Sequence, residues 1–458
     1  MDTIQSRLTS YACGLNYDEL PVDVVHAAKV RVIDTLGALI GGFFGQPLRI
    51  ARDVAARVRD PNGATILGTR IKTTPDMAAF ANAGAAHHIE MQDIYHHCHP
   101  SDVVTPVLSV AEHANVTGRD CILGIVLAYE VFCRVADVFK NQAFDYTNFA
   151  CLGAAVGAGK VLLLPPSQLS HCISMAVVPN VSLRQEKEPR ISMWKEIASG
   201  QAARAGVFAA LLARAGMEGP HLPFEGKAGW CDHVAKERFS LDEMGGHDIP
   251  FRISETSIKN RPAGGSCIAP MLAAEKIAPI KDVNKINRVV AEVYYGRYYQ
   301  SPAAKEPNKE GDRFWNPVTQ GNANHSYPYV VATTLLNGRV TPHSYSDAQV
   351  QDPKVRALMQ KIDIVVNDEF AKAHKSDPPM HRARVTVTAN DGSVLVGEAG
   401  GDQDDLAAPR SDSQVSEKFR ELSEEYLGVK RVTAILEQLW HLETLDNVSR
   451  IPPGLMLD

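Results

Sequence analysis

Apolar residues recur every three or four positions along most of the chain before Asp282, the spacing of helices that bury one face. Residues 21–40 give the clearest pattern, and the glycine pair that follows them is a suitable helix stop. Ser101 and Ser192 offer capping oxygens for two later helices, and Gly216 is placed to end the second of them. Further helices are therefore predicted at residues 50–58, 77–89, 101–114 and 120–139 and within residues 190–220.

The pattern changes around Asp282, where apolar and polar residues begin to alternate. Alternation of this kind is typical of strands with one buried face, and Asn390-Asp391-Gly392 is a strong hairpin turn. Strands are thus predicted at residues 286–295, 361–367 and 383–396. Helical spacing is present between the strands and again near the end of the chain, at residues 324–336, 355–359, 411–427 and 432–442.

This order of elements predicts a mainly α fold with two domains. The chain has 458 residues, which exceeds the size at which a single hydrophobic core usually stops growing. We predict a large all-helical domain that begins with residues 1–268 and a smaller α+β lid domain over residues 269–405. Residues 406–458 are helical in pattern and are expected to return to the first domain.

The composition is that of an ordinary globular protein, with 45% hydrophobic and 22% charged residues. A net charge of −6 gives no basic footprint for nucleic acid. Prolines and polar residues interrupt the longest uncharged stretch, residues 161–183, so no membrane span is expected. The eight cysteines form no CxxC pair, as in a reducing compartment, and no secretory signal is recognisable. These features predict a cytoplasmic protein without nucleic-acid or membrane partners.

The most unusual chemistry lies between residues 84 and 106. Five of the sixteen histidines fall there, beside Glu90 and Asp93, with no lysine or arginine among them. If this stretch were helical, His87, Glu90 and Asp93 would share one polar stripe together with His96. Pro100 excludes the helical conformation for the residue before it, so His99 is expected in a loop just past a helix end.

These residues suit either a solvated helix face or an acid/base site. A metal site is not predicted, because the stretch has no HExxH motif, no CxxC partner and no matching Glu-x-x-His pairs on further helices. In an acid/base site, His99 and the carboxylates would exchange protons while Lys195 and Lys259 hold an anion. The pattern alone favours surface positions for both lysines.

Several short motifs follow one another in an order and spacing that resemble the MmgE/PrpD family, whose members include a 2-methylcitrate dehydratase, a cis-aconitate decarboxylase and an iminodisuccinate epimerase. They are His87-x-x-Glu90-x-x-Asp93, His99-Pro100-Ser101, Leu183-Arg184-Gln185, Ser192-Met193-Trp194-Lys195, Gly216-Met217-x-Gly219-Pro220, Phe224-Glu225-Gly226, Ser257-Ile258-Lys259 and His325-Ser326-Tyr327-Pro328-Tyr329. The resemblance implies a homodimer in which a helical domain and an α+β lid enclose a small carboxylate substrate, without a metal or iron–sulfur cofactor.

The resemblance also implies the residues of the site and a reaction. The reaction is that of a cofactor-independent hydro-lyase, which abstracts a proton next to a carboxylate of a 2-methylcitrate-like hydroxy di- or tricarboxylate. The residues carried over as catalytic are Asp93, His99, Lys195 and Lys259, and those carried over as substrate-binding are Glu90, Arg184, Ser326 and Tyr329.

The chain departs from the family pattern at three positions. Gly264 stands where members often have histidine, Gln320 where arginine is usual after threonine, and Asn324 where an acidic residue is usual. These departures leave other reactions open, namely isomerisation or epimerisation, and decarboxylation, of a related carboxylate. They also leave open a protein that binds a carboxylate without converting it.

Overall fold

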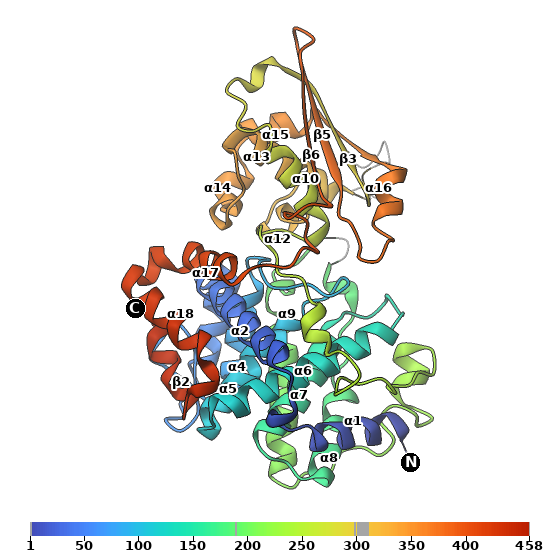
Figure 1. The fold of residues 1–458 in the computed structure, drawn as a ribbon, viewed down its shortest axis with the longest axis vertical. Helices are drawn as coiled ribbons and strands as arrows, with labels where there is room; N and C mark the ends of the chain where they lie inside the picture. Colours follow the sequence, from blue (N-terminus) through green and yellow to red (C-terminus); the bar gives the residue numbers. More distant parts are fainter. Residues whose placement is uncertain (1, 188–189, 297–298, 300–310, 458) are drawn as a thin grey trace.

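Helices form almost the whole of the larger unit, in the lower part of Figure 1. The computed structural model describes residues 2–187, 190–296, 299 and 311–457. Across these residues no helix combines the length and the apolar character needed to cross a bilayer. The helices of this unit are α1 (Thr3–Gly14), α2 (Val22–Gly42), α3 (Gln46–Ala55), α4 (Pro75–His87), α5 (Val104–Ala114), α6 (Gly118–Val138), α7 (Thr147–Val161), α8 (Pro166–Val177), α9 (Lys195–Arg214), α17 (Asp412–Leu427) and α18 (Val429–Trp440).

Most of these helices lie where the apolar spacing predicts them. The predictions for residues 21–40 and 120–139 are confirmed by α2 and α6. Helix α3 begins and ends earlier than predicted, because Pro47 fits the first turn of a helix and so allows an earlier start. A short antiparallel pair, β1 (Ala64–Thr65) and β2 (Lys72–Thr73), was not predicted.

The two predicted serine caps are wrong. Helix α5 is preceded by the 3-10 helix η2 (Pro100–Val103), and the N–H of Ser101 donates to Asp93 Oδ1 at 2.9 Å. Helix α9 starts at Lys195, and the hydroxyl of Ser192 donates to the Glu186 carbonyl at 3.2 Å. In both places another segment of the chain holds the serine before the helix begins: the loop of Asp93 for Ser101, and the 3-10 helix of residues 184–187 for Ser192.

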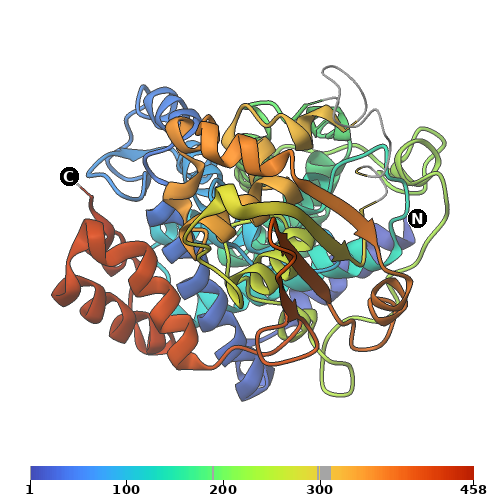
Figure 2. The ribbon, with the colours of Figure 1, turned by 90° about the horizontal axis from the view of Figure 1, so that it is seen from above.

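A four-stranded sheet forms the centre of the smaller unit, above the helical unit in Figure 1 and in the foreground of Figure 2. Its strand order is β4 (Ile362–Val366), β3 (Ile286–Val293), β5 (Ala383–Ala389) and β6 (Val394–Ala399). Strand β3 runs parallel to β4 and antiparallel to β5, and β5 pairs antiparallel with β6. The three predicted strand regions are confirmed, and Gly392 takes the positive φ of 84° that the hairpin turn requires.

The helices of the smaller unit pack around this sheet and around each other. They are α10 (Gly265–Glu275), α11 (Asp312–Trp315), α12 (Gln320–Ala323), α13 (Tyr327–Asn337), α14 (Asp347–Val350), α15 (Pro353–Met359) and α16 (Asp368–Ala373). Residues of α10 and α13 join the strands in a second hydrophobic core, separate from that of the helical unit. The predicted boundary between residues 268 and 269 lies inside α10.

The last helices of the chain lie against the first ones. Figure 1 shows α17 beside α2, and buried residues of α17 and α18 belong to the core of the helical unit. Lys418 of α17 forms a buried ion pair with Asp34 of α2 and also donates to the carbonyl of Met91. The C-terminal segment therefore contacts the loop that carries Glu90. The division into residues 1–268, 269–405 and 406–458 stays a prediction.

The buried pair between Lys418 and Asp34 allows a test of this packing. The change Lys418→Met is expected to lower the free energy of unfolding by about 3–5 kcal/mol, because it leaves a buried carboxylate without its cation. Urea denaturation at neutral pH measures the loss. The control is the double variant Asp34→Asn with Lys418→Met, which removes both charges and should recover much of the stability. A single variant as stable as the wild type would contradict this account.

Candidate active site

Glu90 lies at the point where the predicted helical stripe ends. Helix α4 stops at His87, and Glu90 adopts a left-handed conformation with φ of 55°. That conformation is uncommon for a residue other than glycine and has to be held by its surroundings. Lys259 Nζ donates to the Glu90 carbonyl at 3.2 Å, and Lys418 Nζ donates to the next carbonyl, that of Met91. The turn thus depends on residues far along the chain.

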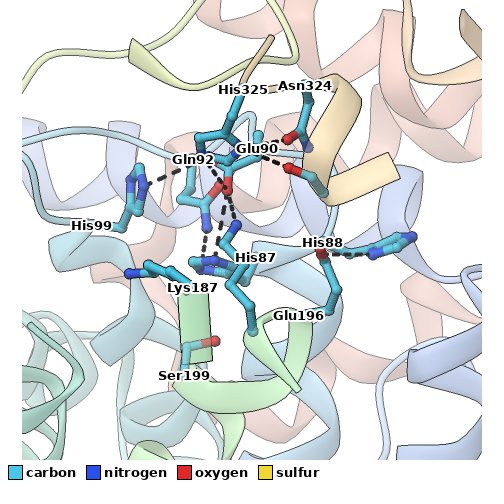
Figure 3. Close-up of polar contacts among 12 residues, drawn as sticks. His87, His88, Glu90, Gln92, His99, Lys187, Glu196, Ser199, Asn324 and His325 are labelled. Carbon is cyan, nitrogen blue, oxygen red and sulfur yellow. Dashed lines mark hydrogen bonds and ion pairs between the residues drawn. The ribbon is translucent and has the colours of Figure 1, made fainter. Parts of the chain in front are cut away.

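The buried side chain of Glu90 is the centre of a group of basic residues, and Figure 3 shows the histidines of this group, His87, His99 and His325, around it. Lys195 Nζ forms an ion pair with Oε1, and Lys259 Nζ lies 3.0 Å from Oε2. Three imidazole Nε2 atoms also face this carboxylate: that of His99 is 3.7 Å from Oε2, and those of His87 and His325 are each 3.8 Å from Oε1. We call these residues the Glu90 cluster; its members are His87, Glu90, His99, Lys195, Lys259 and His325.

Each lysine reaches the cluster from a different element. Lys195 is the first residue of α9, and α9 approaches α4 so closely that a Cβ on Gly200 would lie 2.3 Å from the Phe80 carbonyl oxygen. Lys259 follows a short antiparallel bridge in which Ile94 and Ser257 exchange hydrogen bonds of 2.8 and 2.9 Å. The small residues of α9 and this bridge therefore place both ammonium groups against Glu90.

The charges of the cluster shift the pKa values of its members in different directions. Burial alone would raise the pKa of Glu90, but Lys195 and Lys259 outweigh it and hold that pKa well below its ordinary value. Burial would lower the pKa of Lys195, yet Glu90 and Glu196 raise it. For Lys259, burial dominates and lowers the pKa. Two lysines share one carboxylate, so the cluster has the charge to receive a second anionic group.

His99 presents an unprotonated nitrogen to the cluster. Its Nδ1 lies 2.8 Å from the Asp93 carbonyl oxygen, which can only accept, so Nδ1 carries the proton of the neutral ring. Burial and the nearby Lys259 hold the pKa of His99 well below its ordinary value. The neutral ring therefore presents an unprotonated Nε2 to Glu90 Oε2, 3.7 Å away. This is the state that a general base requires.

The Asp93 carboxylate is directed away from the cluster. Its Oδ1 accepts from the Ser101 N–H at 2.9 Å, and its Oδ2 accepts from the Tyr129 hydroxyl at 3.1 Å. Its backbone carbonyl orients His99. The predicted helical stripe is wrong, because Asp93 and His96 lie in the loop after α4, and His96 pairs with Asp137 at 3.1 Å. The contacts of Asp93 are those of a residue that positions the loop of His99.

Three further residues expected at the site have their contacts elsewhere. Arg184 lies in the 3-10 helix η3 (Arg184–Lys187) with an exposed side chain. Ser326 caps α13 by accepting from the Tyr329 N–H at 3.2 Å. Tyr329 is fully buried in the second core, where its hydroxyl donates to the Ser344 carbonyl. The structure brings none of these three side chains into the Glu90 cluster.

Two histidines of the cluster were not among the predicted site residues. His87 is 1% exposed, and within the described part of the chain its Nε2 has no hydrogen-bond partner. Its other ring nitrogen lies 2.7 Å from Gln92 Nε2 and 3.3 Å from Asp102 Oδ1. His325 lies directly before Ser326, so a signal was present in the motif, but the sequence does not say which of its side chains faces the site.

The three positions that depart from the family pattern surround the same region. A Cβ on Gly264 would lie 2.8 Å from His325 Cδ2. The Asn324 side-chain oxygen lies beside His325 Nδ1. Gln320 donates from Nε2 to the His88 carbonyl at 2.9 Å and so connects the smaller unit to the end of α4. The departures therefore lie where the smaller unit meets the Glu90 cluster.

No group of three or more His, Cys, Asp or Glu side chains among the described residues is arranged to hold a metal ion. In the Glu90 cluster, lysine ammonium groups contact both oxygens of the carboxylate. The arrangement is that of an anion site with proton-transfer groups beside it.

Comparison with known proteins places the chain in a family. Models of the MmgE/PrpD N-terminal and C-terminal domains match residues 6–242 and 267–442. Human cis-aconitate decarboxylase is 24% identical over an alignment of 467 positions, gaps included, which covers 95% of this chain and 91% of that protein. The 2-methylcitrate dehydratase of Salmonella typhimurium is 25% identical over 411 residues, with 83% and 81% covered. The mitochondrial 2-methylcitrate dehydratase of Yarrowia lipolytica is 25% identical over 396 residues, with 81% and 74% covered. The chain belongs to the MmgE/PrpD family.

Proposed function

We propose that this protein is a lyase, and specifically a hydro-lyase that removes water from a small hydroxy di- or tricarboxylate similar to 2-methylcitrate. One observation supports this above all: two buried lysines share the Glu90 carboxylate, and the unprotonated Nε2 of His99 faces the same point. Lysines can hold substrate carboxylates, and a neutral histidine can accept a proton from carbon. The proposed site needs no cofactor.

The proposed reaction begins when a substrate carboxylate binds beside Lys195 and Lys259. His99 Nε2 takes the proton from the carbon next to this carboxylate, and the electron pair of the broken C–H bond spreads onto the carboxylate oxygens. The fixed positive charges stabilise this developing negative charge more strongly than they stabilise the substrate. The electron pair then forms the C=C bond as the C–O bond of the neighbouring carbon breaks. The hydroxide leaves with one proton as water.

Decarboxylation is the second candidate reaction. The human relative named above supports it, because that protein matches nearly the whole chain and is a cis-aconitate decarboxylase. The same lysines would hold the carboxylates, and the same histidine would exchange a proton with the carbon that loses carbon dioxide. Epimerisation would share the proton abstraction but return the proton to the opposite face.

Product analysis with the purified protein distinguishes these reactions. We expect incubation with 2-methylcitrate and related hydroxy acids to give an unsaturated acid, detected by its ultraviolet absorbance. Carbon dioxide release from cis-aconitate would instead identify a decarboxylase, and deuterium uptake without loss of water would identify an epimerase. Calorimetric binding of these carboxylates without conversion would show a non-catalytic binding protein and overturn the proposal.

The pKa of His99 leads to a prediction about pH. Since burial holds this pKa well below 6.5, the neutral base is present both above and below pH 6.5 and is lost only at lower pH. We therefore expect kcat/KM, which reports on the free enzyme, not to fall between pH 7 and pH 6. A base with an ordinary histidine pKa of about 6.5 would lose about two thirds of its neutral form over this interval. A loss of that size in steady-state kinetics would contradict the assignment.

We also propose a homodimer in the cytoplasm, as the family resemblance and the scattered cysteines suggest. All eight cysteines are free thiols. Analytical ultracentrifugation of the purified protein tests the dimer, and a monomer at micromolar concentration would contradict it.

A further inference from the structure

His325 brings a second unprotonated ring nitrogen to the cluster from the smaller unit. It lies between α12 and α13, and its Nδ1 is 3.0 Å from the Gly321 carbonyl oxygen and close to the Asn324 side-chain oxygen. Both partners accept, so Nδ1 carries the proton of the neutral ring and Nε2 is left free. That Nε2 faces Glu90 Oε1, whereas His99 Nε2 faces Oε2. Figure 3 shows the two rings on different sides of Glu90.

Gly264 provides the space in which the His325 ring lies. A Cβ at position 264 would be 2.8 Å from His325 Cδ2 and 3.2 Å from its Nε2, both closer than ordinary contact. The backbone joins the two positions as well, since the Gly264 N–H donates to the Asn324 carbonyl at 2.9 Å. Any side chain at position 264 would therefore displace the ring from its place near Glu90. The His325 ring occupies the space that a side chain at position 264 would fill.

His325 is also the more accessible of the two rings. Its side chain is 30% exposed, compared with 11% for His99, so it can exchange protons with solvent before substrate covers it. Burial is the main cause that lowers the pKa of His325 to about 4, and Lys195 and Lys259 add to this effect although Glu90 opposes it. A bound di- or tricarboxylate would bring negative charges against the same two lysines. These charges favour the protonated ring.

We propose that His325 protonates the hydroxyl group as it leaves, while His99 removes the carbon-bound proton on the other side of Glu90. This inference rests on the proposed hydro-lyase function and assigns the second proton of that reaction. The Nε2–H bond of the imidazolium breaks, and its proton joins the departing hydroxide to give water. His325 is then neutral and His99 protonated, and exchange with solvent restores both rings.

The test compares two leaving groups. Hydroxide needs a proton to leave, whereas fluoride leaves without one, so the analogue of 2-methylcitrate with fluorine in place of its hydroxyl should not require His325. The variant His325→Asn keeps an N–H that can donate to the Gly321 carbonyl. We expect it to lower kcat for the hydroxy acid by about 100-fold or more but to change fluoride release by less than about three-fold. His99→Asn should slow both reactions, because both need the carbon-bound proton removed.

Two further variants separate this role from a structural one. Gly264→Ala, whose Cβ would displace the ring, should show the same selective loss with the hydroxy acid. His343→Asn is the matched control, because His343 is exposed in the smaller unit and pairs with Glu425 outside the cluster. If His325→Asn and Gly264→Ala lose equal activity with both substrates, or lose none with either, the assignment of His325 is overturned. The proposed hydro-lyase function would not be affected by that result. A wild-type protein that converts neither substrate would overturn the proposed function and this inference with it.

Discussion

Replacing His99 with asparagine is expected to lower kcat by about 100-fold or more while KM changes little. The asparagine amide can still donate to the Asp93 carbonyl, as Nδ1 does now at 2.8 Å. It has no atom at the position of Nε2, which lies 3.7 Å from Glu90 Oε2. The variant thus removes the proton acceptor and keeps the hydrogen bond that orders the loop. Steady-state kinetics with the best hydroxy acid measure the effect.

The control for His99→Asn is a second histidine of the same loop. His96 is exposed and pairs with Asp137, so His96→Asn should retain the wild-type kcat. Melting temperature and kinetics should be measured on the same preparation of each variant. If His99 only stabilises the loop before Pro100, His99→Asn will melt earlier but keep its activity per folded molecule. That outcome would end the assignment of His99 as the base.

Replacing Glu90 with glutamine is expected to destabilise the protein by about 3–5 kcal/mol at pH 7. The change leaves Lys195 and Lys259, which are 4% and 0% exposed, without their shared carboxylate. Unpaired buried lysines have lowered pKa values, so the folded state then favours their neutral form. The loss of unfolding free energy should therefore be largest well below the ordinary lysine pKa of about 10.4, and it should shrink as pH rises toward that value. Urea denaturation at pH 7 and pH 9 measures this.

A tricarboxylate gives this variant a second readout. Propane-1,2,3-tricarboxylate lacks the leaving hydroxyl, so it can bind without reacting and can place a carboxylate between the two lysines. We expect it to raise the urea midpoint of Glu90→Gln by more than that of the wild type, because the variant lacks its internal anion. Glu130→Gln is a matched control, since Glu130 is also buried but pairs with Arg134 outside the Glu90 cluster. Equal stabilisation of all three proteins would contradict the anion site.

Local pattern was sufficient to predict the fold class and most elements. The spacing of residues 21–40 and the hairpin turn at Asn390-Asp391-Gly392 specify α2 and the β5–β6 pair without help from distant residues. The end of α4 could not be predicted in this way. Its last turn gives way to the left-handed Glu90, which is held by Lys259 and Lys418, and both lie far away in the sequence. Tertiary contacts override helical propensity there.

The site was predictable only in part for the same reason. The resemblance placed His99, Lys195 and Lys259 together, and they do meet at Glu90. Spacing alone could not show that the Asp93 carboxylate bonds to Ser101 and Tyr129. It also could not show which residue of the motif at 325–329 faces the cluster. Ser326 caps α13 and Tyr329 lies in the second core, whereas His325 faces Glu90.

The measurement that tests the central claim most directly is solvent deuterium exchange followed by proton NMR. The purified protein is brought to equilibrium in D2O with 2-methylcitrate and, separately, with cis-aconitate, so that the reverse reaction can add a solvent deuteron to carbon. We predict that deuterium appears on carbon next to a carboxylate of the recovered substrate or product, and that His99→Asn abolishes this at equal protein concentration. The absence of deuterium from every recovered acid with the wild-type protein, or an equal rate with His99→Asn, would contradict the claim that the Glu90 cluster transfers protons at carbon.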